Sequence, residues 1–384
     1  MSDIGQYPRF SADEMASRHA KVQKLIEENN LAAALVYGSG RFTSDVFWLT
    51  DWPGSREAYV LCQAGADPVV LLQLYNHIPM ARRLSTVKDV RWAGANTATS
   101  LIELLKERKL DNARIGVIGS LPHQHYERLH EALPNADLIE VGGKLRMIRT
   151  IRSAEEIERI RHASQLTDMS MQAMADGLRT GMREDEIPYL IEPAYLKEGG
   201  YAGIHFVASM PMREPTICVP AQYQSERVLQ RGDCVITEIS GAWWGYSGQI
   251  HRTYSLGEAP TKEWEDIHAV AQEAFETIYG LIKDGTSTRE VEEAAELIHR
   301  RGYTIYDDLL HGTNQYPPII QTKSTTRREG GEIIFRENMT ITIQPNVITP
   351  DERMGLQFGE TVLVKKNGCE TFNNFPRRWI VCEA

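Results

Sequence analysis

The hydrophobic and polar positions in the first 150 residues follow two alternating patterns. Short apolar runs with the length of strands occur at 31–37, 58–63, 68–73 and 113–118. Ser11 and Glu14 form a capping box that predicts a helix to about Asn29, and residues 99–108 have helical spacing. Because strands alternate with helices, the sequence predicts a small α/β domain over residues 1–150.

A different pattern begins after residue 150. Ser153 and Glu156 form a second capping box, which opens a long helix to about Gly177. Further helical spacing occurs at 184–198, 262–283 and 287–301. Strand-like runs occur at 234–240, 245–256, 339–345 and 360–365. Since helices and strands are grouped here, residues 151–384 are predicted to form a separate α+β domain.

Composition argues against several classes of protein. With 384 residues, 42% hydrophobic and 24% charged, the chain is long enough for two buried cores. A net charge of −10 argues against a nucleic-acid partner. No apolar stretch reaches the roughly 18 residues that a membrane span needs, and the first residues lack a signal-peptide pattern, so we expect no membrane partner and a cytoplasmic location. Five unevenly spaced cysteines suit neither a disulfide framework nor a zinc site.

Ordered motifs in the second half of the chain resemble one known family. They are Arg152 to Ile157, Arg231 to Asp233, Gly245 to Thr253, His311-Gly312, Met339 to Pro345 and Glu360 to Val364. In this order they resemble the pita-bread family of methionine aminopeptidases, Xaa-Pro dipeptidases, aminopeptidase P and creatinase. The resemblance implies a pita-bread catalytic domain preceded by a creatinase-like N-terminal domain. It also implies a homodimer, in which segments such as 52–57 or 75–77 cap the partner's site.

The positions of the family's metal ligands carry different residues in this chain. Where the metallopeptidases have Asp, Asp, His, Glu and Glu, the chain has Glu238, Gln249, His311, Gln344 and the pair Gly359-Glu360. A neutral amide offers a cation only a weak carbonyl oxygen and does not offset its charge. We therefore expect no metal cofactor, with a single divalent ion at Glu238 and His311 as the alternative.

Two further departures concern the substrate. The family's Pro-His falls on Pro220-Ala221, and Gln315 to Pro318 stand where peptidases have a second histidine, which argues against Xaa-Pro cleavage. Short likenesses to ectoine hydrolase occur at Glu238 to Gly241, Tyr316 to Pro318 and Phe375 to Arg377. These features favour the metal-free branch of the family, which includes creatinase and ectoine hydrolase.

Glu238 and His311 are the predicted catalytic residues. Glu238 lies in an apolar strand, where a carboxylate is either reactive or paired, and it is expected to act as base or nucleophile. The alternative is a structural ion pair with Arg252 or Arg377. His311 is expected to transfer protons at neutral pH, the alternative being an ordinary core histidine. His251 is expected to point away from the pocket.

The remaining candidates are side chains expected to bind the substrate. Gln249 and Gln344 would orient it with paired donors and acceptors, and Glu360 would hold His311 or a substrate cation. Arg377 is a candidate for a substrate carboxylate. The other predicted substrate contacts are Tyr246, His205, Trp243 and Tyr316.

Together these observations predict a metal-independent hydrolase. Its substrate is expected to be a small polar molecule with a C–N bond outside ordinary peptides, such as a cyclic amidine, amide, lactam or guanidino compound. The alternatives are an Xaa-Pro dipeptidase or aminopeptidase with a single unorthodox metal, and a non-catalytic peptide-binding module. A lyase is a further alternative.

Overall fold

The computed structural model describes residues 7–42, 45–54, 56–326 and 331–383. Ser55, part of the predicted capping segment 52–57, lies outside these residues. The chain divides into two compact units, Met1–Arg149 and Thr150–Ala384, which are taken one at a time. Within the described residues, no helix is long and apolar enough to cross a bilayer. The cytoplasmic location stays a prediction.

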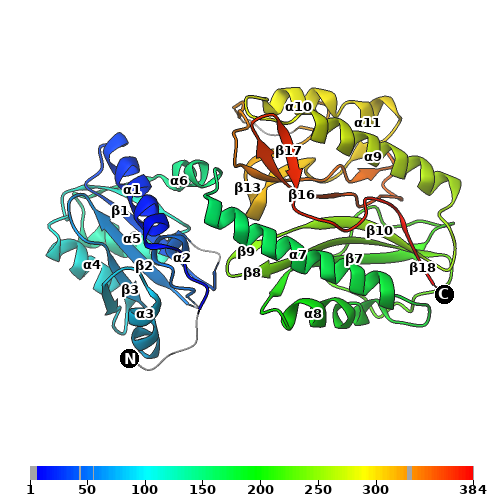
Figure 1. Cartoon of the computed structure of the whole chain (residues 1–384). Helices are drawn as coiled ribbons and strands as arrows, with labels where there is room; N and C mark the ends of the chain where they lie inside the picture. The colour runs from blue at the N-terminus through cyan, green and yellow to red at the C-terminus, as the bar shows by residue number, and fades with distance from the viewer. Residues whose placement is uncertain (1–6, 43–44, 55, 327–330, 384) are drawn as a thin grey trace. The chain divides into compact units, whose positions relative to one another are not determined.

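The first unit is a three-layer α/β structure (Figure 1). Its six-stranded sheet has the order β4-β3-β2-β1-β5-β6, in which β2 is antiparallel to both β1 and β3. The strands are β1 (Ala33–Gly38), β2 (Ala58–Gln63), β3 (Val69–Leu72), β4 (Asp89–Trp92), β5 (Arg114–Ile118) and β6 (Asp137–Glu140). One apolar cluster joins the sheet to α1 (Ala12–Glu28), α2 (Asp45–Thr50), α3 (Ile78–Leu84) and α6 (Gly142–Arg149). A second cluster joins it to α4 (Thr97–Glu107) and α5 (His123–Ala132).

The second unit is built on one large sheet. Its main path has the order β13-β12-β14-β16-β10-β8-β7, and three short strands pair along it. The path strands are β7 (Tyr201–Pro211), β8 (Asp233–Trp243), β10 (Ile250–Leu256), β12 (Leu310–Gly312), β13 (Tyr316–Ile320), β14 (Thr340–Ile343) and β16 (Gly359–Lys365). The strands beside it are β9 (Tyr246–Ser247), β17 (Gly368–Thr371) and β18 (Ile380–Cys382), and a separate pair is β11 (Thr304–Ile305) with β15 (Val347–Ile348).

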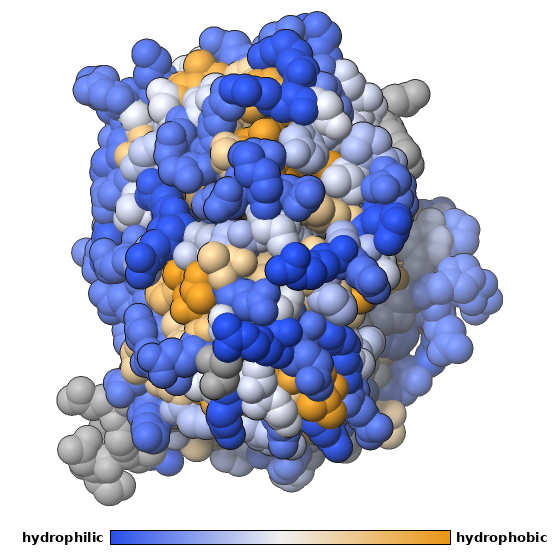
Figure 2. Space-filling model, turned by 90° about the vertical axis from the view of Figure 1, so that its right-hand side faces the viewer, coloured by the Kyte–Doolittle hydropathy of each residue, from blue (hydrophilic) through white to orange (hydrophobic). Residues whose placement is uncertain are grey.

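Helices cover this sheet in two groups. The first is α7 (Ala154–Gly177) with α8 (Pro188–Leu196), and its core includes Ile239 of β8 and Ile250 of β10. The second is α9 (Lys262–Leu281) with α10 (Thr288–Ala294) and α11 (Leu297–Arg300), and its core includes Ile343 of β14 and Val362 of β16. The capping box of Ser153 starts α7 as the sequence predicts, and another capping box at Ser287 starts α10. The face drawn in Figure 2 is mostly hydrophilic, with small separate apolar patches.

The predicted α/β and α+β classes agree with these two units, but some local elements differ. The longest strand besides β8 is β7, and the sequence pattern does not predict it. Only residues 207–210 of β7 are fully buried, so neither alternation nor a long apolar run marks the strand. The predicted helix 184–198 is interrupted between Glu184–Glu186 and α8, since Pro188 begins a new helical turn.

Candidate functional site

Four neighbouring positions form a row across the middle of the large sheet. Glu238 on β8 pairs with His251 on β10, and His251 pairs with Gly359 on β16. Gln344 follows β14 directly, and its Cα lies 2.7 Å from the place where a Cβ on Gly359 would stand. Residues opposite each other on paired strands share a face of the sheet. The row therefore brings Glu238, His251 and Gln344 to one face.

A second row lies beside the first on the same face. Gln249 stands two residues before His251, so strand alternation turns both side chains the same way. The backbone N–H of Gln249 donates to the Thr361 hydroxyl at 3.0 Å, Thr361 pairs with Thr342, and Thr342 pairs with His311. We call the surface that bears Glu238, Gln249, His251, His311 and Gln344 the site face.

Glu238 is a buried carboxyl group held by an amide. It is 7% exposed, and Nε2 of Gln249 donates to its Oε1 at 2.5 Å. Burial, with a smaller contribution from the nearby charge of Asp307, raises the pKa of Glu238 to about 8, although the Gln249 hydrogen bond acts in the opposite direction. The proton-bearing form of Glu238 is therefore well populated near neutral pH.

Gln344 is oriented through only one end of its amide. Its Nε2 donates to Oδ2 of Asp307 at 3.2 Å and to the Asp308 carbonyl at 3.0 Å, while its Oε1 is buried without a hydrogen-bond partner among the described residues. Asp307 was not among the residues predicted from the sequence. Its only signal was an acidic residue in the loop four positions before His311.

The two histidines of the site face are held in the same way. Nδ1 of His311 lies 2.9 Å from the Gly312 carbonyl oxygen, and Nδ1 of His251 lies 3.0 Å from Oε1 of Gln357. Both partners are acceptors, so each Nδ1 carries the proton and each Nε2 carries a lone pair. Both Nε2 atoms are buried without a partner in the part of the chain that the structure describes.

His251 corrects the expectation that it points away from the pocket. A spacing of two residues from Gln249 places both on one face, and the register with Glu238 confirms this. Burial is the main cause that lowers the pKa of His251 to about 3; the His311 imidazole and Arg252 act in the same direction, and the Gln357 hydrogen bond opposes them. His251 is therefore a neutral imidazole near enough to His311 to interact with it electrostatically.

Glu360 and Arg377 lie on the opposite face of the sheet, which corrects both predicted roles. Glu360 stands in register between Ile343 and Ile250, whose side chains pack against the helices. Its carboxylate accepts from Arg252 at 2.7 Å, from Arg377 at 2.9 Å and from a threonine hydroxyl at 2.5 Å. Because one step along a strand reverses the face, Glu360 cannot hold His311, and Arg377 is engaged by Glu360. Glu238 is accordingly not the ion-pair partner of Arg252.

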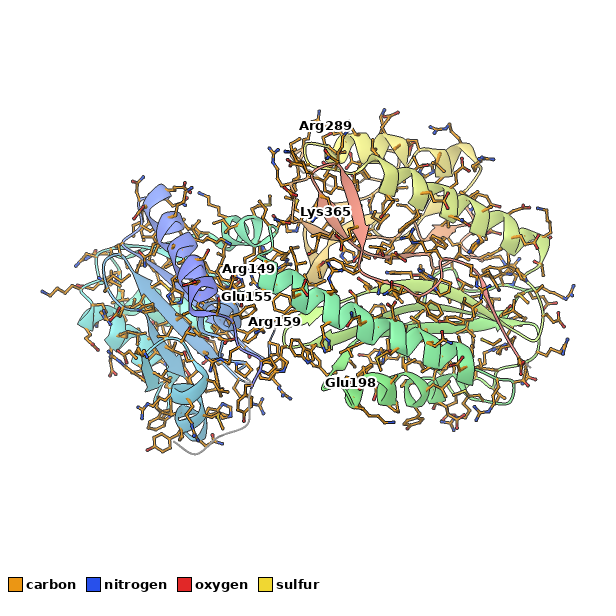
Figure 3. The ribbon with its side chains drawn as sticks, viewed as in Figure 1. Arg149, Glu155, Arg159, Glu198, Arg289 and Lys365 are labelled. Carbon is orange, nitrogen blue, oxygen red and sulfur yellow. The ribbon has the colours of Figure 1, made fainter. Side chains whose placement is uncertain are left out.

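Two of the aromatic candidates have partners on α7. The Tyr246 hydroxyl donates to Oε1 of Glu156 at 3.0 Å. The Trp243 ring lies 5.8 Å from the guanidinium carbon of Arg159, which Figure 3 labels on α7. These contacts engage both aromatic side chains at α7, outside the two rows of the site face.

Tyr316 and His205 also make contacts elsewhere. The guanidinium of Arg152 lies 5.1 Å from the centre of the Tyr316 ring. His205 pairs with Ile239, one step from Glu238, so it points to the other face of the sheet. Burial lowers the pKa of His205 to about 4, and the Glu192 carboxylate lies 3.6 Å from its Nδ1. His205 therefore does not join the site face, and the Tyr316 ring is in contact with Arg152.

The site face does not fit a centre of two metal ions bridged by carboxylates. A Cβ at Gly359 would stand 2.3 Å from the Ile343 carbonyl oxygen, so no ligand-bearing side chain fits there. The amide nitrogen of Gln249 faces Glu238, which leaves one carboxyl group in the two rows. Among the described residues, no three His, Cys, Asp or Glu side chains gather closely enough to hold a metal ion. The acceptors on His251, His311 and Gln344, which have no partner within the described part of the chain, suit a single cation better.

Comparisons with known proteins identify relatives of both units. Residues 158–366 match the model of metallopeptidase family M24, and residues 18–151 match the Creatinase/Prolidase N-terminal domain. The Xaa-Pro dipeptidase of Pyrococcus horikoshii is 23% identical over 375 residues, which cover 96% of this chain and 100% of the relative. The Xaa-Pro dipeptidase of Pyrococcus furiosus is 25% identical, covering 94% and 99%. The X-Pro aminopeptidase structure from Thermotoga maritima has a TM-score of 0.80 at 22% identity, covering 94% and 99%.

These matches confirm the predicted fold, a pita-bread catalytic domain preceded by a creatinase-like N-terminal domain. They also overturn three predictions. The metal-independent hydrolase of a small polar molecule, the restriction to C–N bonds outside ordinary peptides, and the absence of a metal cofactor are all wrong, because the matching model is that of a metallopeptidase family and full-length relatives are named Xaa-Pro dipeptidase. Of the two site-face histidines, His311 stands at one of the family's ligand positions, whereas His251 does not and was predicted on the wrong face.

Proposed function

Because the chain belongs to metallopeptidase family M24, we propose that it hydrolyses the peptide bond of a short peptide, with Xaa-Pro dipeptides as the first class to test, and that it uses one divalent ion. The observation that carries the proposal is the match over nearly the whole of both chains to relatives named Xaa-Pro dipeptidase. The finer likeness to creatinase and ectoine hydrolase is not part of this proposal, because the relatives that match nearly the whole chain carry a peptidase name.

The acceptors without partners suggest where the ion binds. Nε2 of His311 and Oε1 of Gln344 are both buried, and each residue is held through its other polar atom. A bound divalent ion polarises a carbonyl group and lowers the pKa of water. The peptide carbonyl would then lie on the site face, between these acceptors and Glu238.

Glu238 is the proposed proton-transfer group. Its raised pKa places proton uptake and release near neutral pH, where a general base and acid is most effective. The carboxylate takes the proton from the attacking water and gives it to the departing amine nitrogen. Gln249 holds Oε1 of Glu238 in place, so the amide at this position orients the carboxyl group.

The substrate preference at the proline end is open to direct test. Ala221, at the position of the family's Pro-His, forms an isolated bridge to Val207 and offers no imidazole. Purified protein should be assayed against matched dipeptides with and without a C-terminal proline, in the presence of Mn²⁺, Co²⁺ or Zn²⁺. We expect hydrolysis that a chelator abolishes and that Glu238→Ala reduces at least about 100-fold. Glu263→Gln, at an exposed position on α9, is the matched control and should retain full activity.

A second candidate is a peptide-binding module without catalysis, and the amides at two ligand positions favour it. Isothermal titration with the same dipeptides separates the two functions. Binding without turnover in any metal would replace the peptidase proposal by this one. The predicted homodimer and the small-molecule substrate stay predictions, and sedimentation of the full chain would test the former.

A further inference from the structure

The site face holds three acceptor atoms, and each belongs to a side chain whose other polar atom is hydrogen-bonded. Nδ1 of His251 is committed to Gln357, Nδ1 of His311 to a backbone carbonyl, and Nε2 of Gln344 to Asp307 and Asp308. The side chains are 0%, 3% and 2% exposed. Leaving a buried acceptor unpaired costs about 1–3 kcal/mol, so three on one face require an explanation.

The fixed nitrogen of each histidine also sets which atom faces the site. A histidine that binds a metal almost always donates its other N–H to a carbonyl, carboxylate or water, which fixes the ring orientation. His251 and His311 both show this arrangement, one through an amide side chain and one through the backbone. Their lone pairs therefore lie on the Nε2 atoms, which have no hydrogen-bond partner among the described residues.

Gly359 explains how His251 enters the site. This position has no side chain and cannot gain one, because the Ile343 carbonyl and Gln344 occupy the space of a Cβ. His251 and Gln344 are its neighbours on the two sides of the sheet row. The imidazole of His251 therefore lies beside the place where the family would carry its last carboxylate.

We propose that His251 and His311, through their Nε2 atoms, and Gln344, through Oε1, form a nitrogen-rich site for one divalent ion. Imidazole ligands suit Zn²⁺, Ni²⁺, Cu²⁺ and Co²⁺, whereas sites of carboxylates and water suit Mn²⁺ and Mg²⁺. The site should thus take Zn²⁺ or Co²⁺ in preference to Mn²⁺. Three protein ligands leave a position for water or a peptide carbonyl. The catalytic use of the ion rests on the proposed function, but its binding does not.

The test is a count of ions and of nitrogen ligands on the full chain. Protein stripped with a chelator is dialysed against Zn²⁺, Co²⁺ or Mn²⁺ and analysed for bound metal, and the Cu²⁺ form is examined by electron paramagnetic resonance. We expect one ion per chain, tighter binding of Zn²⁺ than of Mn²⁺, and splitting from two nitrogens. His251→Gln should leave one nitrogen and weaken Zn²⁺ binding by on the order of 10- to 100-fold.

His268→Gln is the matched control. His268 lies on α9, and its Nε2 is also buried without a hydrogen-bond partner among the described residues, but it packs against Phe358 instead of joining the site face. The substitution should change neither the metal count nor the two-nitrogen splitting. Circular dichroism of both variants establishes that they fold.

Several results would overturn the inference. These are two Mn²⁺ per chain without nitrogen splitting, no bound ion at all, or an unchanged spectrum in folded His251→Gln. The outcome is separable from the proposed function. A two-nitrogen site in a protein that cleaves no peptide defeats the peptidase proposal alone, and Mn²⁺-dependent cleavage without nitrogen ligands defeats this inference alone.

Discussion

Gly359 and Glu360 are neighbours on β16, but they belong to opposite faces of the sheet. The two faces differ in how their buried polar groups are paired. On the helix-covered face, Glu360 is 1% exposed and every hydrogen-bonding contact of its carboxylate is made by an arginine or a threonine. On the site face, buried acceptors of His251, His311 and Gln344 have no hydrogen-bond partner among the residues that the structure describes. Charge that is fully paired supports the fold, whereas the three unpaired acceptors gathered on one face are where we propose that an ion binds.

The largest effect is expected from Glu360→Gln on the paired face. The substitution leaves the guanidinium of Arg252, also 1% exposed, without its countercharge. Breaking one partner of a buried ion pair costs about 3–5 kcal/mol of unfolding free energy. Urea unfolding measures it. Glu370→Gln is the control, because that residue pairs with Arg161 at 2.8 Å in a much more exposed setting, and its loss should be at most about 1 kcal/mol. Equal losses would contradict the difference.

A smaller effect is expected from Gly359→Ala, which adds one carbon between β16 and β14. The new Cβ would stand 2.3 Å from the Ile343 carbonyl oxygen, so the strands must separate. Overpacking of this kind costs about 1–3 kcal/mol, again measurable by urea unfolding. The same substitution at Gly280 on α9 meets nothing within 4 Å and should leave stability unchanged or raise it. A tolerated Gly359→Ala would mean that this position is not closed.

The smallest effect on stability is expected from Glu238→Gln on the site face. The pKa of Glu238 is raised to about 8, so the carboxyl group already carries a proton at pH 6 and an amide resembles it. In chelator-treated protein at about pH 4, where the carboxyl group is protonated in the unfolded chain as well, the unfolding free energy should change by less than about 1 kcal/mol. Thus the same Glu-to-Gln exchange that disrupts one face should leave the other intact.

The pH dependence of this variant provides a further check. Folding raises the pKa of Glu238 from its ordinary 4.5 to about 8, so the folded chain holds this proton more tightly than the unfolded chain. Its contribution to stability is complete below pH 4.5 and is lost as the pH rises through about 8. Urea unfolding from pH 5 to 9 should therefore show the variant gaining on the wild type as pH rises. Parallel curves would mean that Glu238 is charged in the folded protein.

Several parts of the site were predictable from local patterns. The strands of Glu238 and Gln249 are apolar runs, and the glutamine lies 11 residues on, across a hairpin, so their hydrogen bond follows from pairing those two strands. The position of His311 followed from the resemblance to the family. His251 was predictable too, because a residue two positions from Gln249 must share its face. The prediction for His251 was wrong because strand alternation was applied incorrectly, although the sequence contains the necessary spacing.

Other parts required the tertiary structure. From the sequence motif alone, either Gly359 or Glu360 could occupy the family's last ligand position. Only the pairing of β16 with β10 and β14 shows that Glu360 faces Arg252. Asp307 lies in a loop, where no periodicity predicts its approach to Gln344. A register shift of one residue exchanges the two faces of a strand. The local pattern of hydrophobic and polar residues does not reveal such a shift.

The sequence by itself determined the two-domain fold, the strands that carry the site and the family to which the chain belongs, because these depend on hydrophobic periodicity and ordered motifs. Only the tertiary structure decided which polar side chains meet. In that structure Glu360 pairs with two arginines, and Glu238 is hydrogen-bonded to Gln249. The Nε2 lone pairs of His251 and His311 lie on one face. Those outcomes depend on hydrogen-bond register between strands distant in sequence, where a shift of one residue changes the chemistry without changing the hydrophobic pattern.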